Sequence, residues 1–398
     1  MTPSLLSVLF FAMTGGSGSW VPFLGLYLEQ TGATGPMLAA YLATMPLARV
    51  VAAPLWSMFA DRFRRGELLL RWCTVGSAAI AALVLLPLPP ALIGLALLGM
   101  SIVRAPIGPV LDAMAVKSLA DAGRDVRDYG KIRLWGSFGY LVVGLLASIV
   151  AGRATTPAAP LMLAVGAWAL AALFTLRIPA APPAAPTTIG PALRALAGRR
   201  FTAPYVIGLI FAGAGMNTYD ALYAVHIGAR GLDPAWTGAA LGAGIATEMA
   251  LMAWGRRLLQ RFDPFAIAAA AMALGGLRWA LTAVLTDPWA LTAVQASHGV
   301  VFGAFWLASV EIFRSRAPAE VQTSAQAILT TAGYGIGPLV TSGAMALVLD
   351  PGGTEAMFGL AAISSLVSAA LFGWAGIRDR DEGTGLLRVE SGLKTASA

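Results

Sequence analysis

Three ionisable residues lie near the middles of three successive apolar segments in the second half of the chain: Glu248, Arg278 and His298. An ionisable side chain in hydrocarbon is costly unless it pairs with a partner or faces water. A carboxylate beside a guanidinium and an imidazole can gain or lose a proton when the protein changes conformation or binds a solute. The arrangement therefore predicts proton coupling. The alternative is a static polar network that fixes helix packing.

A second group of ionisable residues occupies apolar segments of the first half. Arg104 and Asp112 share one segment, and Arg133 opens the next within DYGKIRLWGSFGY, from Asp128 to Tyr140. An arginine here is either the cytoplasmic end of a membrane helix or a charge inside a solute cavity. The other ionisable residues in apolar segments are Arg49, Asp220, His226 and Glu311. The last two lie near predicted helix ends, where a side chain can reach the interface or cap the helix.

No arrangement typical of an enzyme accompanies these residues. The sequence has no nucleophile paired with a base and no phosphate-binding loop, because its glycine-rich stretches lie inside apolar segments. Two histidines on separate segments make a poor metal site, and the single cysteine, Cys73, excludes internal disulfides and a cysteine cluster. The sequence thus predicts neither an enzyme nor a cofactor. A transporter-derived sensor or a membrane enzyme remains the alternative from another class.

The composition indicates a membrane protein. The 398 residues are 58% hydrophobic and 12% charged, against roughly 25% charged residues in a soluble domain. The net charge of +7 does not indicate nucleic-acid binding, because the cations lie between apolar runs. About 20 apolar residues cross the hydrocarbon core as a helix. By that measure the candidate transmembrane helices are twelve: 4–28, 36–60, 67–88, 90–115, 131–152, 158–177, 201–226, 236–256, 264–285, 288–313, 321–349 and 355–377.

The distribution of Lys and Arg predicts the orientation. Of the 27 cations, 21 lie in the tail and in loops after even-numbered helices, two in the other loops and four within helices. Because cytoplasmic loops carry an excess of Lys and Arg, both termini are predicted to be cytoplasmic, in a bacterial inner membrane. No Lys or Arg precedes the first apolar run. We therefore expect this run to be kept as a helix and not cleaved as a signal peptide.

The longest break without an apolar run, 178–200, contains PAAPPAAP followed by three arginines. It predicts a cytoplasmic linker between two sets of six helices. The halves also echo one another at an offset of about 198 residues, where Trp56 and Trp254 each precede a cationic cluster. We expect an all-α membrane protein with twelve transmembrane helices in two six-helix bundles, the architecture of the major facilitator transporters. The predicted parts are the bundles 1–177 and 201–377, the linker 178–200 and a cytoplasmic tail, 378–398.

Several motifs carry a resemblance to a known family: DYGKIRLWGSFGY, PVLDAM before it, and GIATEMAL, GGLRWAL and VQASHGVVF in the second half. In order and spacing over nearly the whole chain, the sequence resembles the phenylpropionate permease family. That family is close to the lactose permease and nucleoside proton symporters of the major facilitator superfamily. The superfamily signature between helices 2 and 3 is only partly present, in SMFADRFRRGE, where Ser57 and Arg64 stand at two glycines.

The resemblance implies a solute-binding role for residues of helices 4, 5 and 7. Asp112 matches the helix 4 carboxylate of lactose permease, and Arg133 matches the arginine that binds sugar beside it. Tyr140 falls at the tryptophan on which the sugar ring stacks. Asn217 and Asp220 reproduce the spacing of two helix 7 aspartates.

The resemblance also implies coupling residues, with two departures. Glu248 matches the helix 8 carboxylate that contacts sugar and links to coupling, while Arg278 and His298 match the arginine and histidine of helices 9 and 10. The proton-carrying glutamate three residues after the histidine is Val301 here, and the lysine three residues before it is Gln295. The expected solute-binding residues are Asp112, Arg133, Tyr140, Arg104, Asn217, Asp220 and Glu248. The expected proton-coupling residues are Glu248, Arg278, His298 and Asp220.

These observations predict a secondary active transporter that takes up a small organic solute together with protons. Aromatic carboxylates come first, because Arg104, Arg133 and Arg278 could pair with an anion. Sugars or nucleosides, and efflux by the same fold, are the alternatives. We expect a monomer whose partners are the solute, protons and the lipid bilayer. Aromatic residues that could line the cavity are Trp20, Tyr27, Trp135, Tyr140, Tyr219, Tyr223, Trp279, Phe305 and Trp306.

Overall fold

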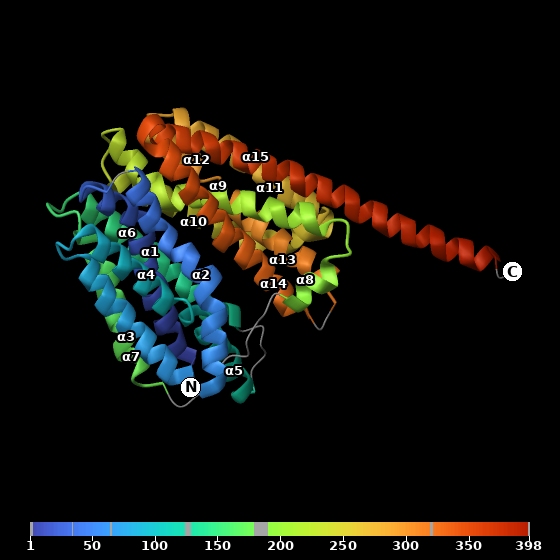
Figure 1. Cartoon of the computed structure of the whole chain (residues 1–398), viewed down its shortest axis with the longest axis horizontal. Coiled ribbons are helices and arrows are strands. Elements are labelled where there is room, and N and C mark those ends of the chain that lie inside the picture. Colours follow the sequence, from blue (N-terminus) through green and yellow to red (C-terminus); the bar gives the residue numbers. More distant parts are fainter. Residues whose placement is uncertain are drawn as a thin grey trace.

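The computed structural model describes residues 3–33, 35–63, 66–123, 129–178, 190–318 and 321–396. Within these ranges the chain is helical and contains no strand. Helices of the first half form one group and those of the second half another, and α15 (Gly337–Ala396) projects away from both at its C-terminal end (Figure 1). The all-α architecture expected from the sequence is confirmed.

The six transmembrane segments predicted for the first half all fall on helices. Segment 90–115 is divided in two, because Pro106 lacks the N–H that would continue the helix begun at Pro90. A short helix also lies in the predicted linker, of which 179–189 are outside the described residues, as is Asp128 of the motif. The helices are α1 (Pro3–Gln30), α2 (Gly35–Phe63), α3 (Gly66–Val84), α4 (Pro90–Arg104), α5 (Ile107–Asp121), α6 (Tyr129–Ala151), α7 (Ala159–Thr175) and α8 (Gly190–Leu196).

The second half is built from longer and more interrupted helices. Two of its predicted segments contain a π-helical stretch, η2 or η4. Gly353, with φ 66° and ψ −173°, breaks α15 between predicted segments 321–349 and 355–377, and the helix then continues past Arg378 into the predicted tail. The elements are α9 (Thr202–Ala229), α10 (Ala235–Arg261), α11 (Pro264–Val284), α12 (Pro288–Gln295), η2 (Gly299–Ala304), α13 (Phe305–Arg316), α14 (Gln322–Thr331), η4 (Ala332–Ile336) and α15.

Two helices of the second half start at the same local signal, an aspartate followed by proline. The carboxylate of Asp263 accepts a hydrogen bond from the N–H of Ala266 at 3.1 Å, and Asp287 accepts from Ala290 at 2.7 Å. Each aspartate satisfies a backbone donor that the first helical turn leaves free, and proline fits the first turn because it has no N–H to satisfy. These caps fix where α11 and α12 begin.

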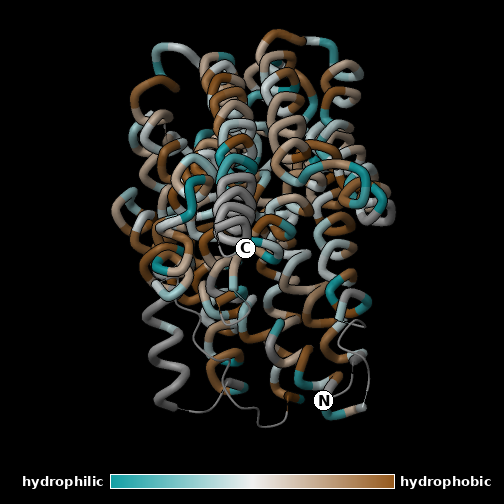
Figure 2. Tube along the Cα trace, turned by 90° about the vertical axis from the view of Figure 1, so that its right-hand side faces the viewer, coloured by the Kyte–Doolittle hydropathy of each residue, from teal (hydrophilic) through white to brown (hydrophobic). Residues whose placement is uncertain are grey.

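Many of the helices are long and apolar enough to cross a membrane. Apolar residues run along the helices between hydrophilic loops (Figure 2). Among the described residues, eight stretches are long and apolar enough to cross a membrane, from Ser4–Gln30 to Ala325–Glu382, the last of which contains two predicted segments. Helices α7, α9 and α10 cover further predicted segments without meeting the same measure of length and apolarity.

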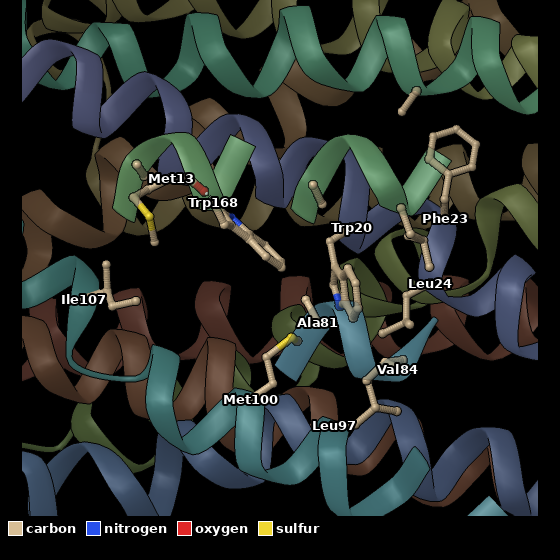
Figure 3. Packing of buried hydrophobic residues seen from close by; sticks show 14 of the residues in the cluster. Met13, Trp20, Phe23, Leu24, Ala81, Val84, Leu97, Met100, Ile107 and Trp168 are labelled. Atoms are coloured by element: carbon tan, nitrogen blue, oxygen red, sulfur yellow. Dashed lines mark hydrogen bonds between the residues drawn. The ribbon is translucent and has the colours of Figure 1, made fainter. Parts of the chain in front are cut away.

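Packing inside the first half centres on two tryptophans. Trp20 of α1 and Trp168 of α7 are fully buried with ring centroids 5.4 Å apart, among side chains that include Met100 (Figure 3). The indole of Trp168 also donates to the carbonyl of Met13 at 3.1 Å. This core joins α1 to α3, α4 and α7, and it places the opposite face of α1 against α6 and α9.

Within the described residues the two halves meet chiefly through α1 with α9, α6 with α10, and α2 with both η4 and α15. The contacts involve one end of each pair. A Cβ at Gly25 of α1 would strike the carbonyl oxygen of Ala221, and one at Gly238 of α10 would strike the side chain of Ser148. The groups diverge toward the ends that carry the N terminus and α8 (Figure 1).

Ion pairs hold the start of the predicted tail against the end of the predicted linker. Arg316 of α13 donates to the carboxylate of Asp379 at 2.8 Å, and Arg199, after α8, pairs with Glu382 at 2.7 Å. The first turns of the tail are therefore part of the second helical group.

Candidate functional site

The candidate site lies between the two halves. A small cavity of about 10 Å³, room for about one water molecule, opens there. Three tyrosines and one carboxylate supply most of its lining. The lining residues are Pro22, Tyr140, Tyr219, Asp220, Tyr223, Thr237 and Leu241, from α1, α6, α9 and α10. Tyr140 and Asp220, two residues that the sequence predicts to bind solute, therefore line the same cavity from opposite halves.

Arg278 organises the polar residues of the second half. Its side chain is 2% exposed, and it donates from Nε to Oε1 of Gln295 at 2.8 Å and from Nη1 to Nδ1 of His298 at 3.0 Å. The guanidinium also lies over the rings of Trp279, at 4.0 Å, and Tyr219, at 4.7 Å. The predicted neighbourhood of Arg278 and His298 is thus present in the structure.

The contact with Arg278 assigns the tautomer of His298. A guanidinium only donates hydrogen bonds, so Nδ1 must accept and the imidazole hydrogen lies on Nε2. That Nε2 faces Oε2 of Glu248 at 3.8 Å. While Arg278 holds Nδ1, His298 is neutral, and Glu248 is the member of the three that can take up a proton without breaking the contact.

Gln295 is a site residue that the sequence analysis noted only as a departure. It is fully buried, accepts from Arg278 and donates from Nε2 to Oγ1 of Thr282 at 2.9 Å. Thr282 in turn donates to the carbonyl of Arg278 at 2.8 Å. A glutamine one turn before His298 in an apolar helix was the available signal.

In the first half, Asp112 has a partner that the sequence analysis missed. The hydroxyl of Tyr129 donates to Oδ1 of Asp112 at 2.7 Å, joining α6 to α5. Arg133 lies within electrostatic reach of both Asp112 and Glu248, which belong to different halves. Its guanidinium is exposed and lies 5.6 Å from the ring of Phe10. Tyr129 opens the motif YGKIRLWGS, so the signal was in the sequence.

Arg104 is tied into helix packing. Its Nη2 donates to the hydroxyl of Ser17 at 2.9 Å, and its guanidinium lies 3.9 Å from the ring centroid of Trp168. These contacts join α4 to α1 and α7. Its other terminal nitrogen, Nη1, is buried and has no hydrogen-bond partner among the described residues.

The charges of Asp220, in the second half, and Arg49, in the first half, act on one another across the interface. Asp220 is exposed in the space between the halves and feels the charges of Arg49 and Arg278. Arg49 also donates to the carbonyl of Tyr334 in η4 at 3.4 Å. Asn217, one turn before Asp220, is half-buried.

His226 and Glu311, the two candidates near predicted helix ends, have nearby partners. His226 bonds to Thr354 at 2.7 Å and to the carbonyl of Thr282 at 2.9 Å. Glu311 pairs with Arg314, one turn further along α13, at 2.5 Å. Through Thr282, which donates to the carbonyl of Arg278 and accepts from Gln295, His226 is also joined to the network around Arg278.

The aromatic residues expected to line the cavity divide into two sets. Trp20, Trp279 and Phe305 are buried in packed cores, so their expected contact with a cavity is not what the structure has. Tyr140, Tyr219 and Tyr223 do line it. Sequence pattern could not separate the sets, because both consist of aromatic residues within apolar helices. Within the described residues no group of three or more His, Cys, Asp or Glu could hold a metal ion.

The family model described as "MFS_1 like family" matches residues 4–359. The chain belongs to this family and is a transporter of the major facilitator superfamily, not an enzyme. The resemblance noted in the sequence is confirmed at the level of the superfamily.

Named relatives agree with this assignment. A maltose permease of Geobacillus stearothermophilus is 27% identical over 350 residues, which cover 84% of each chain. The uncharacterized transporter YwbF of Bacillus subtilis is 22% identical over 367 residues, covering 90% of this chain and 88% of its own. Among solved structures, the nucleoside transporter NupG is similar with a TM-score of 0.80 at 20% identity, over 94% of this chain and 99% of NupG. This last likeness is one of fold.

Proposed function

We propose that the protein is a symporter that takes up a small organic solute together with protons, and that an aromatic carboxylate is the solute. The observation that carries the proposal is that Glu248 lies 3.8 Å from Nε2 of a neutral His298, whose Nδ1 accepts from Arg278. The charge of Arg133, from the other half, also acts on Glu248. A carboxylate in this position responds both to the distance between the halves and to a bound anion.

In this proposal Asp112 and Arg133 hold the solute and Tyr140 packs against its ring. Arg104 and Asn217 contribute further donors, and Asp220 and Glu248 complete the binding surface. Three central arginines (Arg104, Arg133 and Arg278) stand against three central carboxylates (Asp112, Asp220 and Glu248). An anionic solute adds one negative charge, which favours protonation of a carboxylate. Solute and proton would then bind together, with Glu248, Arg278, His298 and Asp220 as the coupling residues.

We further propose the topology read from the sequence. Two bundles, 1–177 and 201–377, move against one another around the linker 178–200, with both termini and the tail 378–398 in the cytoplasm. The protein acts as a monomer in a bacterial inner membrane.

The test is solute-induced proton uptake in proteoliposomes that contain a pH-sensitive dye, with 3-phenylpropionate as the probe. We expect Glu248→Gln to abolish proton uptake while exchange of labelled solute across the membrane persists, because exchange needs no net proton movement. Glu311→Gln is the matched control, since Glu311 pairs with Arg314 outside the site. An undiminished pH change in Glu248→Gln removes Glu248 from coupling.

Sugar uptake is the second candidate, favoured by the similarity to a maltose permease over 84% of both chains. Competition between labelled 3-phenylpropionate and unlabelled maltose or uridine distinguishes the solute classes. Competition by maltose at lower concentration than by unlabelled 3-phenylpropionate would favour the sugar.

A further inference from the structure

A row of aromatic rings runs along the predicted segment 288–313. It begins at His298, just before η2, and continues into α13. The rings of His298 and Phe302 are 5.4 Å apart and nearly parallel, at 3°, and those of Phe302 and Trp306 are 6.2 Å apart at 17°. Tyr334 of η4 closes the row edge-on against Trp306, at 5.8 Å and 67°. We call these four residues the aromatic ladder. Eight residues separate His298 from Trp306, a rise of about 12 Å along a helix.

The ladder faces the interface between the halves. At one end, the ring of His298 lies 6.1 Å from that of Tyr219, which lines the interface cavity. At the other end, the carbonyl of Tyr334 accepts a hydrogen bond from Arg49 of the first half. The four side chains are half-buried, whereas Phe305 and Phe313 of the same helix are fully buried in the core. The ladder is therefore less covered than the fully buried face of α13, although Trp306 also packs against the core of the second half.

The rings of the ladder offer their edges to the interface. Because His298, Phe302 and Trp306 cover one another's faces along the helix, the edge opposite each Cβ is what points outward. The Nε2 edge of His298 lies 3.8 Å from Oε2 of Glu248 on α10. Ring edges carry positive charge and prefer the negative face of another π-system. A saturated sugar ring has no such face.

We propose that the aromatic ladder is a second binding surface for the transported solute, beyond the residues around Arg278, and that it selects a solute with a planar aromatic ring. The ring of the solute lies edge-to-face on Phe302 and Trp306, while its charged group stays near Arg133 and Arg278. The hydroxyl of Tyr334 is buried with no hydrogen-bond partner in the part of the chain that the structure describes, and in this proposal it binds a polar substituent of the solute. This inference rests on the proposed function and names the chemistry of its solute.

The test compares two probes of equal charge and length, 3-phenylpropionate and 3-cyclohexylpropionate, by equilibrium binding to the purified full-length protein. We expect the wild-type protein to prefer the phenyl probe. Edge-to-face contacts correspond to about 2- to 12-fold in affinity for each ring. Phe302→Leu and Trp306→Leu should each remove this preference by lowering affinity for the phenyl probe and leaving that for the cyclohexyl probe. Trp374→Leu is the matched control, because Trp374 is 47% exposed on α15 and outside the ladder.

Equal affinity for the two probes in the wild-type protein, or a phenyl preference that survives both substitutions, would overturn the inference. Binding of maltose without binding of the phenyl probe would overturn it too. The proposed function is measured separately by proton uptake. Proton-coupled flux of maltose or uridine in a protein without phenyl preference would retain symport and reject the ladder. Phenyl preference without proton uptake would retain the ladder as a ring-binding surface and reject symport.

Discussion

At the scale of single residues, Arg278 determines how the candidate site can behave. It is buried, it holds Gln295 and His298 through different nitrogens, and its Nη2 is buried without a partner. A buried unpaired donor is costly. We expect an anion that reaches Nη2 to offset this cost, which would connect the polar network to solute binding.

We expect Arg278→Lys to lower transport by about tenfold or more. A single ammonium at the end of a flexible chain cannot reproduce the fixed fork that reaches Gln295 and His298 together. Initial rates of labelled solute uptake in proteoliposomes measure the effect. Arg314→Lys should transport normally, because Arg314 pairs with Glu311 at the surface. Normal uptake by Arg278→Lys would mean that the network only supports packing.

Tyr129→Phe tests the hydrogen bond to Asp112. Its loss removes about 1 kcal/mol, and we expect solute affinity to fall about fivefold if Asp112 binds solute in the orientation that Tyr129 sets. Titration of binding to the purified protein gives the value. Tyr41→Phe serves as a control, since its hydroxyl donates to the carbonyl of Pro90 away from the site. Equal affinities for both variants and the wild type would separate Asp112 from solute binding.

At the scale of elements, close helix approach depends on glycine. Where α1 crosses α6, a Cβ at Gly139 would strike the backbone of Phe11, and one at Gly18 would strike the backbone of Tyr140. Backbone cannot move aside as a side-chain tip can. The position of Tyr140 at the interface therefore depends on the small residues of both helices.

Gly139→Ala should lower the thermal stability of the protein, because overpacking costs about 1–3 kcal/mol. Gly166→Ala in α7 should be neutral or stabilising, since nothing lies within 4 Å of a Cβ there and alanine favours a helix. Melting temperatures of the two variants in detergent provide the comparison. Similar melting temperatures would show that α1 and α6 can separate without cost.

At the scale of the whole molecule, the halves touch at one end and diverge at the other (Figure 1). The touching end includes Ser148 of α6 and Gly238 of α10. Solute cannot leave through a closed end, so a transport cycle needs these helices to separate.

A disulfide between Ser148→Cys and Gly238→Cys, in a Cys73→Ala background, should stop uptake, and reduction should restore it. A Cβ at Gly238 would lie closer to the Ser148 side chain than the Cβ atoms of a disulfide do, so α6 and α10 must shift slightly apart for the bond to form. Ser148→Cys alone should transport normally, and uptake by Gly238→Cys alone should be the same with and without the oxidant. Uptake by the fully cross-linked protein would show that the cycle does not open this end.

Much of the fold could be predicted from the sequence, and less of the site. The apolar segments, their breaks at proline and the capping aspartates act locally, so periodicity and composition locate the helices. The candidate site residues could be proposed from the sequence because ionisable groups are rare in apolar segments. Tyr129 and Gln295 were missed because neutral polar side chains are not conspicuous there, and Trp20, Trp279 and Phe305 were misplaced because sequence does not say which face of a helix is covered.

The sequence by itself determined that the chain is an all-α membrane protein, because the length and number of its apolar segments leave little alternative in a bilayer, and its motifs carried the resemblance to the major facilitator superfamily. The tertiary structure decided which charges are neighbours. Glu248, Arg278 and His298 stand on three helices, and only packing brings Nδ1 of His298 to Arg278 and Nε2 toward Glu248. The same packing leaves Phe302 and Trp306 half-buried beside the fully buried Phe305, because the burial of a side chain depends on how whole elements dock.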